Sequence, residues 1–179
     1  MNLTERAMSL DLMIKSNTPV VHRGTGIYIR ENGGSKELET KQEVLKYFPD
    51  VNPDTIEETS YEDDTYFHVN LTHNLTKMAS NCKVIGTCNY DADSAVVTLY
   101  DLLWHPKENL KIITPNLDYL EDLVVCYKEL LQNPDFYKQY NPENGWGTYE
   151  QLVKATKEYI KALTSTSDEF ENYTIVADT

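Results

Sequence analysis

The hydrophobic period of the sequence changes within residues 65–78, TYFHVNLTHNLTKM, and this change limits the folds open to the chain. The first half of the stretch alternates between apolar and polar residues, as a half-buried strand does. The second half has helical spacing, and either Asn70 or Thr72 is the expected N-cap. The residues predicted to be buried on the helical side are Leu71, Leu75 and Met78. A strand that leads directly into a helix predicts one core shared by both kinds of element.

Similar patterns divide the rest of the chain into strands, then helices, then a closing strand. Strands are expected at residues 9–15, 22–30 and 173–177. Helices are expected at residues 39–48, 93–104, 115–131, 134–140 and 149–163. This order predicts an α+β fold, in which a small antiparallel sheet packs against a helical bundle and the closing strand pairs with the first. At 179 residues the chain is expected to form a single domain over residues 1–179, with an acidic inserted segment at about 31–65.

Short motifs predict where the helices begin and which of their faces are buried. Asp93 or Ser94 is the expected cap of the helix that runs to residue 104. Thr114 followed by a proline predicts the start of the longest apolar helix. Thr148 and Gln151 form a capping box for the last helix. The residues expected along the buried face of the helix after Thr114 are Leu117, Leu120, Val124, Tyr127 and Leu131, and Cys126 is expected as a small core residue.

The chain is strongly acidic, with 16 basic residues, 29 acidic residues and a net charge of −13. This disfavours direct binding to free DNA, because affinity for nucleic acid depends on neutralising phosphates. The acidic residues are densest at 50–64, and no lysine or arginine lies between Lys46 and Lys77. Such a run is either a solvated loop or a surface that docks on a basic partner. The candidate partner-binding residues are Glu57, Glu58, Glu62, Asp63 and Asp64.

Polar side chains able to bind ligands or move protons gather around the strand-to-helix junction. His68 and His73 are the candidates for acid–base catalysis, because histidine alone titrates near neutral pH without help. The candidate ligand- or phosphate-binding residues are Asn70, Asn74, Lys77, Tyr66 and Trp146. The alternative is that the histidines and amides have a structural role. They would then accept hydrogen bonds from the free N–H groups at the helix N-terminus, which need such partners. The histidines lack spaced carboxylates, so no metal site is predicted, although a nuclease could use a divalent ion.

Several familiar signatures are missing from the sequence. It contains no nucleophile elbow, phosphate-binding Walker loop, dinucleotide fingerprint or HExxH motif, so the enzyme classes that depend on them lose support. It has no long apolar run, so no membrane span is expected. The first residues, MNLTERAMSLDLM, lack the basic start and apolar centre of a signal peptide, which predicts a cytoplasmic protein.

Four segments together resemble a family of small phage- and prophage-encoded proteins. They are SLDLMI at 9–14, VNLTHNLTKMA at 69–79, LYDLLWHPKE at 99–108 and NPDFYKQYNPENGWGTYEQLVKATKEYI at 133–160. The family pattern has an SLDVYL-type strand, an xITHNLxKMA helix, an ALWRPEE segment and an FNPxNGWGTYE loop. The resemblance covers the first strand and most of residues 69–163, and it is most specific in THNL and NGWGTYE. Where members often have an arginine between Trp and Pro, this chain has His105.

The resemblance implies a phage origin and a compact α+β core. Small acidic phage proteins of this kind include inhibitors of host defence, and some inhibitors of type II CRISPR systems are similar in size and character. Those inhibitors bind the Cas9–guide RNA complex, compete with DNA or lead to damage of the guide. Together with the net charge of −13 and the acidic run at 50–64, the resemblance gives the leading hypothesis, which is an anti-CRISPR protein that acts on the Cas9–guide RNA complex in the cytoplasm of the bacterial host. One alternative is a nuclease that cleaves guide or other RNA with His73 and His68. Another is a module that captures a nucleotide signal, and the sequence leaves open whether the protein is an enzyme.

Overall fold

The computed structural model describes residues 9–31, 34–86, 96–106 and 112–179. These residues fall into two compact units. The larger unit comprises the residues up to Asn17 together with Thr65–Thr179, and the smaller unit comprises Thr18–Asp64. Each unit has a hydrophobic core of its own. The single domain with an acidic insertion at about 31–65 stays a prediction.

Four strands form the sheet of the larger unit, in the spatial order β4-β1-β8-β7. They are β1 (Leu10–Gly24), β4 (Thr59–Leu71), β7 (Ile112–Ile113) and β8 (Tyr173–Asp178), and β1 and β4 continue into the smaller unit. Strands β1 and β8 are antiparallel, in a register that runs from Asp11 opposite Asp178 to Ser16 opposite Tyr173. The predicted pairing of the closing strand with the first is therefore confirmed. A separate antiparallel pair joins β5 (Lys83–Ile85) to β6 (Val96–Thr98).

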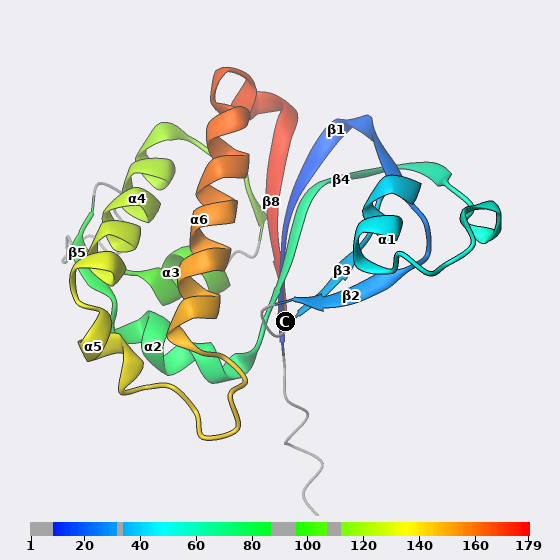
Figure 1. The fold of residues 1–179 in the computed structure, drawn as a ribbon. Helices are drawn as coiled ribbons and strands as arrows, with labels where there is room; N and C mark the ends of the chain where they lie inside the picture. The colour runs from blue at the N-terminus through cyan, green and yellow to red at the C-terminus, as the bar shows by residue number, and fades with distance from the viewer. Residues whose placement is uncertain (1–8, 32–33, 87–95, 107–111) are drawn as a thin grey trace, which may run out of the picture. The chain divides into compact units, whose positions relative to one another are not determined.

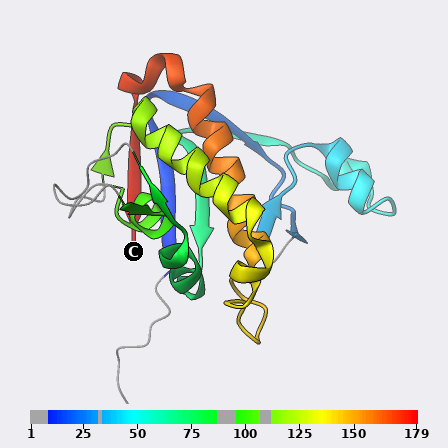
Figure 2. The same ribbon diagram turned by 90° about the vertical axis from the view of Figure 1, so that its left-hand side faces the viewer.

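Helices cover one face of this sheet, as Figures 1 and 2 show from two directions. They are α2 (Thr76–Asn81), α3 (Leu99–Trp104), α4 (Leu117–Gln132), α5 (Pro134–Lys138) and α6 (Tyr149–Ser165), with 3-10 turns η2 (His73–Leu75) and η3 (Ser167–Asn172). The two long helices, α4 and α6, pack side by side. The expected α+β fold, with a small antiparallel sheet against a helical bundle, is confirmed.

The core of the larger unit lies between the sheet and these helices. Every second residue of β1 from Leu10 to Ser16 is buried, as the alternation at 9–15 predicts. Helix α6 contributes residues including Tyr159, and α4 contributes Tyr119. The hydroxyl of Tyr119 donates to the backbone carbonyl of Leu102 and lies 3.0 Å from the Tyr159 hydroxyl. Each fully buried large apolar side chain stabilises the fold by roughly 1.5–3 kcal/mol, so this layer is what holds the sheet in place.

The smaller unit has two short strands, β2 (Tyr28–Glu31) and β3 (Gly34–Glu37), which form an antiparallel hairpin. Its other elements are helix α1 (Lys41–Tyr47) and the 3-10 turn η1 (Pro53–Thr55). The side chains of Leu38, Val44 and Ile56 are buried together as its core. This unit is small, so most of its side chains are exposed or only half-buried.

Two predicted strand boundaries are wrong. The strand expected at 22–30 is two elements, because β1 continues to Gly24 and β2 begins only at Tyr28. Gly26 separates them with a φ of +70°, a left-handed conformation that ends a strand. The acidic run at 50–64 is not one loop, because β4 begins at Thr59 and carries its last acidic residues on a strand.

Two predicted helix starts also need correction. Residues 96–98 form β6, and α3 begins at Leu99 after a capping box between Thr98 and Asp101. The expected caps Asp93 and Ser94 lie outside the described residues. Helix α4 is capped by Asn116, whose side-chain oxygen accepts from the N–H of Tyr119, and not by Thr114.

The buried face of α4 is rotated from the prediction. Its buried residues are Tyr119, Asp122, Leu123, Cys126 and Leu130. Two residues expected in the core, Leu117 and Leu131, are 60% and 49% exposed. A leucine-rich helix offers two apolar stripes, and the elements that pack against α4, chiefly α6, α3 and β5, cover only one of them. The expectation that Cys126 is a core residue is confirmed.

Candidate functional site

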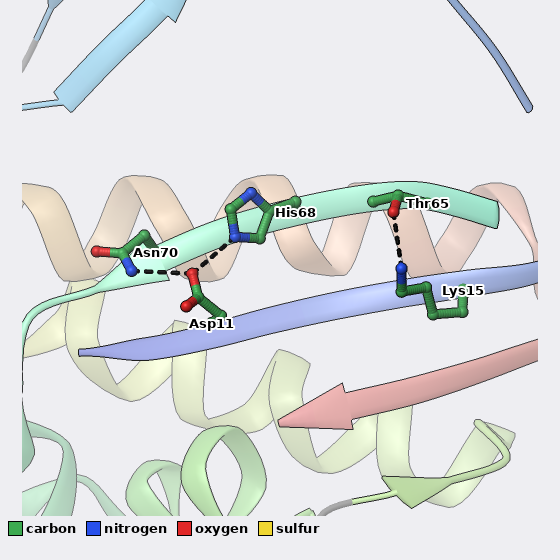
Figure 3. A network of polar contacts seen from close by, with 5 residues as sticks. All are labelled: Asp11, Lys15, Thr65, His68 and Asn70. Carbon is green, nitrogen blue, oxygen red and sulfur yellow. Dashed lines mark hydrogen bonds and ion pairs between the residues drawn. The ribbon is translucent and has the colours of Figure 1, made fainter. Parts of the chain in front are cut away.

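The polar residues at the end of β4 form a cluster around a carboxylate on the neighbouring strand β1 (Figure 3). His68 Nε2 lies 2.8 Å from Oδ1 of Asp11, and the side-chain amide of Asn70 donates to the same oxygen at 2.9 Å. His68 and Asn70 are two positions apart on a strand, so their side chains leave the same face. Farther along the same two strands, the Lys15 ammonium donates to the Thr65 hydroxyl at 2.9 Å.

The Asp11 carboxylate is the acceptor of this cluster. The hydrogen bond from Asn70 lowers the pKa of Asp11, partial burial opposes this, and His68 lowers the pKa further through its hydrogen bond and charge. An ionised carboxylate can only accept, so Nε2 of His68 must carry the proton that points at it. In the neutral ring Nδ1 is then the nitrogen able to accept a proton. The side chains of His68 and Asp11 are 48% and 43% exposed, so a solvent-borne group can reach the imidazole.

Tyr66, another of the candidate ligand-binding residues, has aromatic neighbours. Both Tyr66 and Phe67 pack against the core of the larger unit. The Tyr66 ring meets the ring of Tyr173 edge-on at 5.2 Å, and Phe67 stacks on Tyr159 at 5.8 Å. Two consecutive residues that pack against the core break the strict alternation expected of this strand.

The helical part of the junction meets the loop that precedes α6. Thr72 caps η2 by accepting from the N–H of Asn74, so one of the two predicted caps is confirmed. The Asn74 side chain donates to the backbone carbonyl of Trp146 at 3.0 Å, while the indole of Trp146 is 55% exposed. The Lys77 ammonium lies 5.7 Å from the centre of the Tyr140 ring. Asn74 and Lys77 therefore contact this loop and help to hold it, which is a structural role different from the capping role considered from the sequence.

The two histidines take different positions. His68 is paired with Asp11, whereas His73 is an exposed residue of η2. Leu71, Leu75 and Met78 are buried, as predicted. The junction thus brings His68 and Asn70 together around Asp11, and brings Asn74 to Trp146, as two separate groups of contacts.

The acidic candidates lie on the smaller unit and differ in what they contact. Glu58 Oε1 accepts a hydrogen bond from the N–H of Lys41 at 2.6 Å, at the start of α1. Asp63 Oδ1 lies 2.8 Å from Nε2 of His22. Glu57, Glu62 and Asp64 are exposed. Glu58 therefore supports the local fold, whereas Glu57 and Glu62 present their charge to solvent.

Sequence reasoning missed Asp11, the residue around which the first cluster is built. Its position on a strand was predicted, and the alternation at 9–15 places it away from the core. The missing information was that β1 pairs with β4, because strand pairing between residues 57 positions apart leaves no local signal. His22 was missed for the same reason, since its partner Asp63 lies on the paired strand.

Within the described residues, no three or more His, Cys, Asp or Glu side chains are grouped as metal ligands. The part of the chain that the structure describes also has no helix with both the length and the apolar character needed to cross a membrane.

We compared the chain with protein-family models, curated proteins and solved structures, and none of them matched.

Proposed function

We propose that this protein is a phage-encoded inhibitor of a bacterial defence nuclease, and specifically an anti-CRISPR protein that binds the Cas9–guide RNA complex. The observation that carries this proposal is the first part of β4, where every residue from 59 to 64 is exposed and three are acidic. Cas9-type nucleases hold nucleic acid in a positively charged channel. Exposed carboxylates on a chain of net charge −13 complement such a channel and compete with DNA for it.

Exposed aromatic residues favour docking over a merely solvated acidic face. Tyr61 lies within the acidic part of β4 and is 55% exposed. Tyr28, on the hairpin of the same unit, is 58% exposed. Tyrosine is enriched among the residues that dominate binding energy at protein interfaces, whereas a surface kept only for solubility needs none.

The contacts of the carboxylates decide which of them should be changed in a test. Reversing the charge of Glu58 would also remove the hydrogen bond to Lys41, so a loss of binding would be ambiguous. Asp63 has the same difficulty because of His22. Glu57 and Glu62 are exposed, and changing them alters the charge of the surface with the least effect on the fold.

The test compares a double variant, Glu57→Lys with Glu62→Lys, with the wild type in DNA cleavage by a Cas9–guide RNA complex. We expect inhibition to weaken about tenfold or more, and wild-type association to weaken steeply with salt. Guide RNA is examined on the same samples and should stay intact. The matched control is Glu121→Lys with Glu171→Lys, which makes the same change in net charge at exposed positions of the larger unit. Equal losses in both double variants, or no loss in the first, would contradict the proposal.

A second candidate function, cleavage of guide or other RNA, is favoured by the pairing of His68 with Asp11. A carboxylate that fixes one ring nitrogen leaves the other positioned to accept a proton from a ribose hydroxyl, as in general base catalysis. Asn70 donates to the same carboxylate oxygen and so helps to hold Asp11 in place. This candidate predicts shortened RNA with the wild type and intact RNA with His68→Ala. His73→Ala is the comparison, and parallel reactions with magnesium or a chelator test for a divalent ion.

A further inference from the structure

Two tyrosines, a histidine and two carboxylates gather on the smaller unit. The rings of His22 and Tyr61 are stacked, with centroids 5.1 Å apart and planes 26° apart. His22 Nε2 lies 2.8 Å from Oδ1 of Asp63. In the β2–β3 hairpin, Tyr28 lies directly opposite Glu37. We name these five residues the tyrosine–carboxylate patch.

The patch has two parts: Tyr28 and Glu37 lie on the β2–β3 hairpin, and His22, Tyr61 and Asp63 lie on β1 and β4. The Glu37 carboxylate raises the pKa of Tyr28, and Tyr61 makes a smaller contribution in the same direction. Geometry also joins the two parts of the patch. A Cβ atom added to Gly24, two residues after His22 on β1, would meet the Glu37 carboxylate. The Gly24 carbonyl accepts from the hydroxyl of Thr59, two residues before Tyr61 on β4, at 3.2 Å. Both tyrosine rings are more than half exposed, at 58% and 55%.

Contacts within the unit hold the patch in shape before any partner arrives. Glu37 Oε1 accepts a hydrogen bond from the N–H of Gly26 at 2.9 Å, which fixes that carboxylate beside the hairpin. The stacked ring of His22 and its contact with Asp63 restrain Tyr61. Side chains ordered in advance lose less conformational entropy on binding, so such a surface binds more tightly than a mobile one of the same composition.

We infer that the tyrosine–carboxylate patch binds the guanidinium group of an arginine presented by a basic partner protein. The faces of exposed tyrosine rings attract a cation, and a planar guanidinium can stack on them while donating to carboxylates at its edge. Lysine fits less well, because a compact ammonium neither stacks nor forms paired hydrogen bonds. A nucleic acid is disfavoured because Glu37 and Asp63 would face its phosphates. The inference rests on the proposed function in taking the partner to be the nuclease.

The inference can be tested on the protein alone with a short peptide of three arginines separated by glycines. In an NMR titration, the ring resonances of Tyr28 and Tyr61 should shift saturably. Matched peptides with citrulline or lysine in place of arginine should bind at least about fivefold more weakly. Tyr28→Leu and Tyr61→Leu should each raise the Kd of the arginine peptide by about fivefold, whereas Tyr61→Phe, which keeps an aromatic face, should not.

Two further variants make the test specific to the patch. Tyr47→Leu removes another exposed tyrosine of the same unit, on α1, and should leave the Kd unchanged. Arg30 lies two residues after Tyr28 on β2, and Arg30→Gln should leave the Kd unchanged or lower it, because a nearby like charge is removed. An amide NMR spectrum of each variant verifies that it is folded.

Equal binding of the citrulline or lysine peptide would overturn the inference, as would unchanged binding by both Tyr28→Leu and Tyr61→Leu. Binding of a single-stranded RNA oligonucleotide at the same resonances would also overturn it. These results are separate from the fate of the proposed function. If the protein binds arginine but does not inhibit Cas9, the arginine site is supported and Cas9 is excluded as its partner. If Tyr28→Leu and Tyr61→Leu inhibit Cas9 as strongly as the wild type does, the patch takes no part in inhibition. That result would not contradict the proposed function.

Discussion

A Cβ atom added to Gly147 would lie 3.0 Å from the Cβ of Asn74, so the loop before α6 and the turn after β4 touch at these two residues. Gly147 also has a φ of +90°, which side chains rarely adopt. The NGWGTYE segment therefore needs glycine here for two independent reasons, one of backbone conformation and one of space.

Replacing Gly147 with alanine should destabilise the larger unit by roughly 2–4 kcal/mol, because backbone strain and overpacking add. Gly145 is the matched control, since its φ is +73° but an added Cβ would meet nothing within 4 Å. Gly145→Ala should cost only about 1–2 kcal/mol. Urea unfolding of both variants measures the difference, and equal destabilisation would show that the contact with Asn74 is unimportant.

Thr148→Ala should destabilise the protein by about 1 kcal/mol, because the Thr148 side chain caps α6. It accepts from the N–H of Gln151, whose own side chain accepts from the N–H of Thr148. Thr164→Ala, near the exposed end of the same helix, is the control, since its hydroxyl bonds only an i−4 carbonyl that is already part of the helix. The measurement is urea unfolding followed by circular dichroism, and similar free energies for the two variants would argue against a capping role.

Asn70→Ala should raise the pKa of Asp11, because the hydrogen bond from Asn70 is the largest cause that lowers it. A lowered folded-state pKa means that the ionised form of Asp11 adds stability above the ordinary value of 3.8, and that this stability is lost as pH falls through the folded pKa. The free energies of wild type and Asp11→Asn should therefore differ most near neutral pH and converge in acid. NMR titration of the Asp11 carboxyl carbon checks the first statement, and an unchanged pKa in Asn70→Ala would show that another contact controls it.

Tyr119→Phe should cost about 1–3 kcal/mol, because it leaves the buried carbonyl of Leu102 without its donor. Tyr47→Phe removes a hydroxyl from an exposed ring on α1 and should change stability by less than about 0.5 kcal/mol. Thermal unfolding of the two variants supplies the comparison. A Tyr119→Phe protein as stable as the wild type would mean that water or a shifted side chain satisfies the carbonyl.

Local signals in the sequence predicted the elements that depend on neighbours along the chain. The capping box of Thr148 and Gln151, the buried alternation of β1 and the closing strand β8 were all predicted from short patterns. The cap of α4 was placed two residues early, because Thr114 before a proline and Asn116 are both good caps and only packing chooses between them. Residues 96–98 were assigned to a helix, because a short apolar run is compatible with either element until its partner strand is known.

The candidate site was harder to predict because its contacts are distant in sequence. His68 and Asn70 were identified by residue type, but their shared partner Asp11 could be found only from the pairing of β1 with β4. The exposure of Tyr61 likewise depends on tertiary structure, since tyrosine in a strand pattern normally predicts burial. The sequence therefore identified which residues could bind ligands or move protons, but their contacts could be found only from the fold.

Strands β1 and β4 each continue from the larger unit into the smaller one, and the bond between Lys15 and Thr65 joins them close to the boundary. The smaller unit is therefore entered and left through neighbouring strands, so its two chain ends lie close together. A segment attached in this way can be lengthened, shortened or exchanged for another hairpin without shifting the register between β1 and β8. The smaller unit can therefore vary in sequence and length while the core of the larger unit stays the same.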